Sequence, residues 1–215
     1  MELENFKKNI LARIEELKKK KFGEMQIPCS FGGKDYKLIL LTAECANDPM
    51  LMALLSVWRK KHEFWFLTQF PISAERTAAW FENKVIKTPD RILFIIEVDG
   101  KYIGHVGLFR FDFEKVTCEI DNILRGEDNV LPGIIGNSVS SMMQWGRDNL
   151  GIKGYTLQTT SDNEKALRLY GRLGFFETKR VPLVYNKTDE GGEWVEALAG
   201  SKTEIKRYDV YMQLK

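Results

Sequence analysis

The chain has 215 residues, of which 44% are hydrophobic and 29% charged, and this balance predicts one folded globular domain rather than disorder. Its 32 basic and 30 acidic residues give a formal net charge of +2, so we expect no nucleic-acid partner. Three widely spaced cysteines without a CxxC pair argue against a disulfide scaffold and a zinc site. We therefore expect no metal and a cytoplasmic location.

The first 20 or so residues are predicted to form an amphipathic helix that ends near Gly23. Its apolar residues recur at helical spacing: Phe6, Ile10, Ile14 and Leu17. No segment has the apolar core of a signal peptide or the roughly 20 apolar residues of a membrane span, so we expect no membrane partner. We divide the chain into a helical extension, 1–30, and a main domain, 31–215. The helix would pack on that domain or on a second subunit, so a homodimer is one expected assembly.

The next predicted elements are a connection, a strand and two helices. Residues 24–33 contain Pro and a Gly pair and are predicted to form a connection, and the apolar run in 34–44 predicts a strand. A helical region follows from about residue 48 to 66. Ser73 is the expected cap of a second helix, which would bury Phe81 and Val85.

The middle of the chain changes to a strand pattern. Two apolar runs within 91–111 are separated by Asp99 and Gly100, which predicts a β-hairpin. A third strand is expected at 115–126 and a helix at 131–151. The tail is then predicted to alternate: strand 154–160, helix 161–173, and closing strands 175–185 and 204–214 with a loop at 186–203 between them. This order indicates a mixed α/β domain.

The helix at 161–173 carries more than packing residues. Asn163 can cap its amide end and Gly174 can end it at positive φ, but neither role explains Tyr170. A phenol with a pKa near 10 can donate a proton to a leaving thiolate without being ionised at neutral pH. The alternative is a tyrosine whose ring covers the sheet.

The pattern N-x-x-A-x-x-x-Y-x-x-x-G-F directly after a strand, here Asn163, Ala166, Tyr170, Gly174 and Phe175, resembles the GNAT superfamily of acyl-CoA-dependent N-acetyltransferases. The resemblance runs from about residue 36 to the C-terminus. It implies an α/β (α+β) GNAT fold: a central mixed, mostly antiparallel twisted sheet flanked by helices, here with an extra N-terminal helix. It also implies acetyl-CoA as cosubstrate, with Asn163 and Ala166 beside the CoA arm and Tyr170 near the thioester sulfur.

The resemblance further implies a pyrophosphate loop before the long helix, with the pattern Q/R-x-x-G-x-G/A. Gly133 falls at the first glycine of that pattern, but Ile135 falls at the second and Val130 stands where Gln or Arg is usual. Backbone amides at a helix start can hold phosphate without particular side chains. We therefore expect the CoA phosphates on the amides of Leu131, Gly133, Ile134, Ile135, Gly136 and Asn137, and the pantetheine arm along Ile123, Leu124 and Arg125.

Carboxylates on the strand 115–126 are candidates for the catalytic base. Glu119 and Asp121 are two residues apart and should share a strand face, opposite Ile120 and Asn122. Either one, or an ordered water, would take the proton of the attacking amine or hold the substrate. The alternative is that both are polar residues on a wetted face.

A narrower resemblance concerns the acceptor. The stretch "VWRKKHEFWFLTQFPISAERTAAWF" is similar to the corresponding segment of bacterial amino-sugar N-acetyltransferases that act on nucleotide-linked sugars for polysaccharide and flagellin glycosylation. It implies a small-molecule amine, a nucleotide sugar, bound by Arg59, His62, Trp65 and Asn122. The alternatives are a ribosomal-protein-type peptide amine acetyltransferase and a catalytically silent acyl-CoA-binding module.

Overall fold

The structure is a computed structural model that describes residues 2–198 and 204–215. By its internal contacts the chain forms two compact units. Unit 1 comprises Met1–Trp58 and Ser73–Tyr155, and unit 2 comprises Arg59–Ile72 and Thr156–Lys215. The predicted boundary between residues 30 and 31 falls inside a strand, and the division into extension and main domain stays a prediction.

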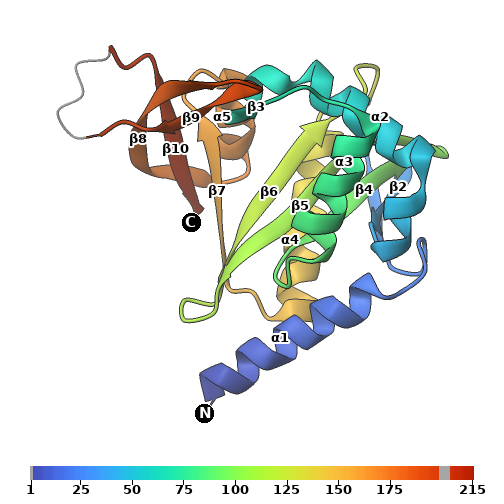
Figure 1. The fold of residues 1–215 in the computed structure, drawn as a ribbon. Helices are drawn as coiled ribbons and strands as arrows, with labels where there is room; N and C mark the ends of the chain where they lie inside the picture. The colour runs from blue at the N-terminus through green and yellow to red at the C-terminus, as the bar shows by residue number, and fades with distance from the viewer. Residues whose placement is uncertain (1, 199–203) are drawn as a thin grey trace. The chain divides into compact units, whose positions relative to one another are not determined.

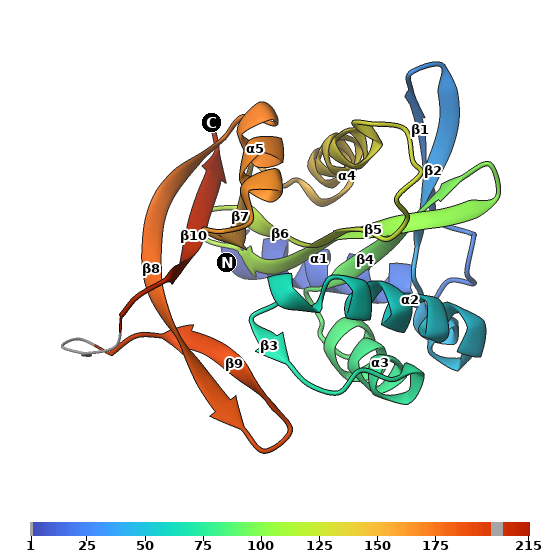
Figure 2. The same cartoon turned by 90° about the horizontal axis from the view of Figure 1, so that it is seen from above.

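Unit 1 contains an antiparallel sheet with the strand order β1-β2-β4-β5-β6. Figure 2 shows α4 on one face of β4, β5 and β6, with α2 and α3 on the other face. Buried apolar side chains of β4 and α4, including Phe94 and Val139, form the core between them. The elements are α1 (Glu2–Lys18), β1 (Gln26–Phe31), β2 (Lys34–Leu40), η1 (Ala43–Asn47), α2 (Pro49–Lys61, whose last turn enters unit 2), α3 (Ala74–Trp80), η3 (Phe81–Ile86), β4 (Ile92–Val98), β5 (Lys101–Asp112), β6 (Thr117–Arg125) and α4 (Ile134–Leu150).

Local sequence signals explain several of these boundaries. Ser73 caps α3 by accepting a hydrogen bond from the Arg76 amide at 3.2 Å, as predicted. The turn between β4 and β5 has positive φ at Asp99 and Gly100, the conformation that two-residue hairpins favour. The expected connection at 24–33 is wrong, because residues 26–31 form β1 and pair with β2 around a turn at Gly32 and Gly33.

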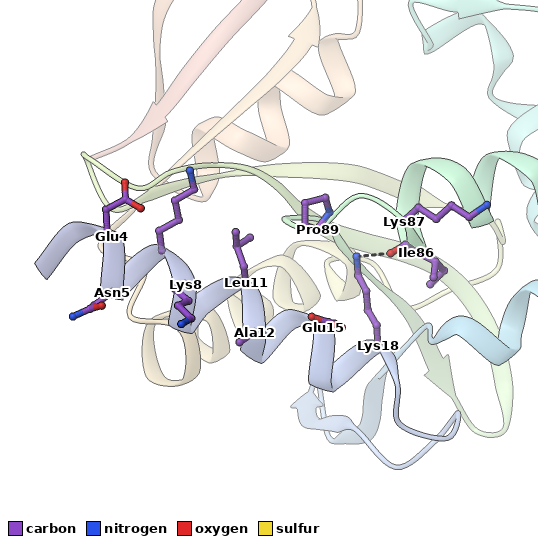
Figure 3. A pocket seen from close by; sticks show the side chains of 11 residues that line it. Glu4, Asn5, Lys8, Leu11, Ala12, Glu15, Lys18, Ile86, Lys87 and Pro89 are labelled. Atoms are coloured by element: carbon purple, nitrogen blue, oxygen red, sulfur yellow. Dashed lines mark hydrogen bonds between the residues drawn. The ribbon is translucent and has the colours of Figure 1, made fainter. Parts of the chain in front are cut away.

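Helix α1 packs along unit 1 through Ile10, Ile14 and Leu17, which are buried. At its end, Lys18 is buried and its Nζ donates to the carbonyls of Val85 at 2.8 Å, Thr88 at 2.6 Å and Ile86 at 3.1 Å. Figure 3 shows the bond to Ile86. The carbonyls of Val85 and Ile86 lie in the last turn of η3, and the ammonium caps this helix terminus. Burial lowers the pKa of Lys18 to about 8.

Unit 2 contains a second antiparallel arrangement with the order β7-β10-β8-β9-β3. Its elements are η2 (Glu63–Trp65), β3 (Thr68–Gln69), β7 (Gly154–Thr160, whose first two residues lie in unit 1), α5 (Glu164–Arg172), β8 (Phe175–Thr188), β9 (Gly191–Glu196) and β10 (Arg207–Leu214) (Figure 1). The predicted loop at 186–203 is wrong in its first part, because β8 and β9 form a long hairpin there. Its residues 199–203 lie outside the described residues.

The predicted fold class, a mixed α/β GNAT fold with a helix at its N-terminus, is confirmed by this arrangement and by the comparisons below. Cys29, Cys45 and Cys118 are free thiols. Within the described residues, no helix is long and apolar enough to cross a membrane.

Candidate active site

The start of α4 lies on a backbone that only glycine adopts easily. Gly133 precedes the helix at φ +94°, and no side chain caps the first turn. A Cβ at this position would lie 2.8 Å from Cζ of Phe31, at the tip of β1. Helix starts leave amide donors without intrahelical acceptors, and the first turn of α4 has no acidic residue. The donors around Ile135 and Gly136 therefore suit an anion such as a phosphate.

Side chains below this helix start hold it to the β1–β2 hairpin. The Tyr36 hydroxyl of β2 donates to Oδ1 of Asn137 at 2.6 Å and accepts from Oγ of Ser138 at 3.3 Å. Burial raises the pKa of Tyr36 to about 12. Leu131 lies against Gly32 in the same hairpin. The Asn137 side chain is thus engaged with Tyr36, and its backbone amide donates to the Gly133 carbonyl at 3.0 Å.

The two predicted base candidates on β6 are both in ion pairs. Glu119 is buried and accepts two hydrogen bonds from Nη1 of Arg110, at 2.7 and 2.9 Å. Asp121 pairs with Arg91 and accepts a hydrogen bond from the Asn122 side chain at 2.7 Å. A carboxylate has about four lone-pair sites, so a base in this place would share its oxygens between an arginine and the amine.

Strand β6 is irregular directly after Asp121. Asn122 has φ +51°, and the pairing of β5 with β6 shifts register between His105 and Gly107. Nδ1 of His105 lies 2.6 Å from the Asn122 carbonyl oxygen, and since a carbonyl only accepts, Nδ1 carries the proton. Beyond this bulge, Ile123 is half-buried, Leu124 is buried and Arg125 is exposed, with Nη2 3.7 Å from Asp128.

Helix α5 in unit 2 brings three predicted residues together. Asn163 caps the helix, because its Oδ1 accepts from the Ala166 amide at 3.2 Å. Tyr170 is 7% exposed, and its ring meets Phe175 edge-on with centroids 6.4 Å apart. Gly174 ends the helix at φ +92°. Every residue of the sequence pattern therefore has a structural role, and Tyr170 is a largely buried phenol two turns from the cap.

The acceptor segment, residues 59–68, is only partly available for a substrate. The Arg59 guanidinium stacks 3.4 Å over the ring of Phe66 and donates to the Thr68 carbonyl at 2.8 Å, and burial lowers its pKa to about 10. Trp65 is 39% exposed and packs edge-on against Phe64, which is 54% exposed. His62 lies directly before η2. The aromatic pair rather than Arg59 presents the open surface of this segment.

Sequence reasoning missed a buried arginine in unit 2. Arg207 of β10 is 2% exposed and forms a bidentate ion pair with Asp162, with its Nη2 2.7 Å from Oδ2. Asp162 directly precedes the Asn163 cap. No local pattern marks Arg207, since one arginine in an alternating strand is ordinarily an exposed residue.

A pocket of about 740 Å³ lies in unit 1 between α1 and the segment after η3 (Figure 3). Lys8, Leu11 and Glu15 of α1 line one side, and Ile86 and Pro89 line the other. None of the predicted site residues lines this pocket. Its lining mixes both signs of charge with apolar side chains, and we assign it no part in the candidate active site.

Comparison with known proteins identifies the domain. Residues 37–176 match the family model of the acetyltransferase (GNAT) domain. Comparison with curated proteins finds no match. A spermidine N-acetyltransferase from Vibrio cholerae, solved with CoA and spermine, is similar in structure with TM-score 0.61 and 16% identity, over 83% of this chain and 94% of that one.

Two further solved structures have similar values. A GCN5-related N-acetyltransferase from Brucella melitensis has TM-score 0.61 and 19% identity, over 90% of this chain and 80% of that one. RimL, a ribosomal L7/L12 alpha-N-protein acetyltransferase, has TM-score 0.59 and 12% identity, over 90% of this chain and 97% of that one. At these identities the likeness shows the fold. Because the family model covers well over half of the sequence, the chain belongs to the GNAT acetyltransferase family.

Proposed function

We propose that this protein transfers an acetyl group from acetyl-CoA directly to a primary amine. The observation that carries the proposal is helix α5, where Asn163 caps the helix and Tyr170 lies buried two turns further along. A cap is common to many helices, but packing alone does not require a phenol at position 170. The family match adds support, since the matched segment includes this helix.

The start of α4 fits the phosphates of acetyl-CoA. Its first-turn amides point out of the helix, its dipole favours negative charge, and no carboxylate in that turn opposes an anion. Gly133 has no side chain to cover these donors. We assign the phosphates to the amide donors within residues 131–137 that no backbone carbonyl of the described residues accepts, chiefly those of Ile135 and Gly136. Pro132 has no N–H, and the amides of Ile134 and Asn137 donate to the carbonyls of Leu131 and Gly133. We assign the pantetheine arm to residues 123–125.

Acetyl-CoA supplies an activated acetyl group with a thiol leaving group. Tyr170 would donate its phenolic proton to the sulfur as negative charge develops there. The attacking amine has to be neutral, so a base has to take its proton. Glu119 and Asp121, each paired with an arginine, are the proposed groups, acting directly or through an ordered water.

For the acceptor we propose the amino group of a nucleotide-linked sugar, bound near His62 and Trp65. The exposed rings of Phe64 and Trp65 supply a surface on which a sugar or base can stack. Lys60 and Lys61 close the last turn of α2, where Lys60 pairs with Glu63 at 2.8 Å, and their ammonium groups are the proposed positive charge for a diphosphate. The alternative acceptor is the N-terminal amine of a peptide.

A screen of acetyl-CoA consumption tests the proposal. It compares UDP-linked amino sugars, peptides with a free N-terminus, and spermidine, and calorimetry with CoA runs in parallel. We expect CoA binding and turnover with the nucleotide sugars. Turnover with peptides alone would establish the alternative, CoA binding without any turnover would indicate a silent acyl-CoA-binding module, and no CoA binding would refute the proposal.

A further inference from the structure

The buried arginine of unit 2 has one edge fully occupied. Nε and Nη2 of Arg207 donate to Asp162 at 3.0 and 2.7 Å, and Nη2 also donates to the Phe64 carbonyl at 3.2 Å. The guanidinium lies 4.5 Å from the ring centre of Phe64 and 4.6 Å from that of Trp194. Residues from η2, β9 and β10 and from the turn before α5 therefore meet at one side chain.

Two N–H donors of this cluster have no acceptor in the described part of the chain. Nη1 of Arg207 and Nε1 of Trp194 are buried and have no hydrogen-bond partner among the described residues. A buried donor without an acceptor loses its hydrogen bonds to water without replacement, and the loss is larger when the donor is charged. Native proteins rarely keep such a cost, and the exceptions occur where a ligand or an ordered water completes the site. The cluster thus calls for an oxygen acceptor.

The charge of the cluster selects the kind of oxygen. Burial acts to raise the pKa of Asp162, but its hydrogen bonds and charge interaction with Arg207 outweigh burial, and the pKa is lowered. The carboxylate is therefore ionised at neutral pH and already compensates the guanidinium. A second anion would find no net positive charge, whereas a hydroxyl or carbonyl oxygen matches N–H groups that only donate. An ammonium group, which has only donors, is disfavoured.

The position of the cluster connects it to the acceptor. Phe64 belongs to the same exposed aromatic pair as Trp65, and Asp162 is directly followed by Asn163. Tyr170 lies seven residues after that cap on α5, which is roughly 10 Å along the helix. An amine that reacts near Tyr170 and also carries a hydroxyl or carbonyl group roughly 10 Å away has the dimensions to reach this region.

We propose that Nη1 of Arg207 and Nε1 of Trp194 bind a neutral oxygen, a hydroxyl or a carbonyl, of the amine substrate. This inference rests on the proposed acetyl transfer and narrows its acceptor to an oxygen-bearing amine, such as an amino sugar or a peptide. It separates the chain from enzymes whose acceptor is a polyamine.

Trp194→Phe tests the assignment because it removes one N–H donor and keeps an aromatic ring beside Arg207. Tyr185→Phe is the matched control. It lies in the same β8–β9 hairpin, its ring is 5.3 Å from Trp194, and it removes a hydroxyl that donates to Gln69 at 3.1 Å. The probes are a UDP-linked amino sugar, an alanyl peptide amide and spermidine. Loss of one hydrogen bond to a neutral group should raise the KM of the oxygen-bearing probe about 2- to 10-fold, with kcat and the acetyl-CoA Kd unchanged.

The sugar and peptide probes distinguish a hydroxyl from a carbonyl as the bound oxygen. Equal KM values in Trp194→Phe and Tyr185→Phe would show that water or the chain's own backbone meets these donors, and would overturn the inference. A clear preference of the parent for spermidine would also overturn it. If acetyl-CoA binds and amines are acetylated in either case, the proposed function stands without this inference.

A measurement on the parent covers the case in which Trp194→Phe unfolds. The indole N–H resonance of Trp194, identified by sequential assignment, should move downfield when the reactive probe is added in the presence of CoA. An unchanged resonance at saturating probe would contradict the assignment.

Discussion

The starts of α4 and α5 show two ways to begin a helix. In α5 a side chain makes the cap, since Asn163 accepts from the Ala166 amide. In α4 no side chain does so, and Gly133 enters the helix at φ +94° with Phe31 packed over it. The start of α5 therefore depends on the identity of its side chains. The start of α4 depends on backbone geometry and on packing against the β1–β2 hairpin, which is distant in sequence.

This difference explains why one motif matches its family pattern and the other matches poorly. Amide donors do not depend on the identity of the residue that carries them, so Ile135 can stand where the pattern has a small residue. A phenol that protonates a thiolate has no backbone substitute. The following substitutions test this contrast.

The largest effect is expected at Tyr170, the proposed general acid. Tyr170→Phe should lower turnover about 10²- to 10⁴-fold, the usual contribution of a general acid, and leave the acetyl-CoA Kd nearly unchanged because the hydroxyl acts as the thiolate develops. Single-turnover kinetics and calorimetry measure the two quantities. Turnover within about twofold of the parent, with chemistry limiting, would reduce Tyr170 to a packing residue.

At the start of α4, Gly133→Ala should weaken acetyl-CoA binding about tenfold. A positive φ costs a non-glycine residue about 1–3 kcal/mol, and the new Cβ would lie 2.8 Å from Phe31. The control is Gly33→Ala, which has φ +77° with nothing within 4 Å of its Cβ. It should lower the Tm without changing the acetyl-CoA Kd, and equal Kd values in the two variants would remove the α4 start from the binding site.

Substitutions of Asn163 distinguish two roles of its side chain, capping α5 and the proposed contact with the cosubstrate. Asn163→Ala should lower the free energy of unfolding by about 1 kcal/mol, whereas Asn163→Asp keeps a capping oxygen and should change it little. If the side-chain amide also donates to the CoA arm, Asn163→Asp should raise the acetyl-CoA Kd about 2- to 10-fold. Urea unfolding and calorimetry measure these values. A parent-like Kd in Asn163→Asp would limit the residue to capping.

The smallest effect on binding is expected below α4. Tyr36→Phe removes the hydrogen bonds to Asn137 and Ser138 and should cost about 1 kcal/mol of unfolding free energy, with the acetyl-CoA Kd changed by at most about twofold. Because burial raises the pKa of Tyr36 to about 12, the folded state favours the neutral phenol. Its stabilising contribution is present below the usual pKa of about 10 and is lost as the pH rises from about 10 to 12.

Urea unfolding of the parent and Tyr36→Phe at pH 8 and pH 11 tests the sign. The advantage of the parent should shrink by about 1 kcal/mol at the higher pH. An advantage that grew with pH would show that the phenolate, not the phenol, is the form held below α4.

The sequence by itself determined the elements that depend on nearby residues. Ser73 and Asn163 cap helices because their side chains reach amides three residues away, and Asp99 with Gly100 turns a hairpin through its own backbone. The motif around Tyr170 also consists of residues that are close in sequence, so the sequence alone was enough to predict the family. It failed for β1 and for the β8–β9 hairpin, where pairing with a partner strand overrode turn-forming residues.

Only the tertiary structure decided which polar groups are engaged. Arg59 appeared available for a diphosphate, yet Phe66 and Thr68 hold it. Glu119 and Asp121 were predicted as candidates for the base, and the structure shows that Arg110 and Arg91 pair with them. Arg207 carried no signal at all, because its partners Asp162, Phe64 and Trp194 come from three separate stretches of the chain. Ion pairs form between residues that are close in space. The spacing of residues along a sequence predicts such pairs only where a single helix, turn or hairpin brings the two residues together.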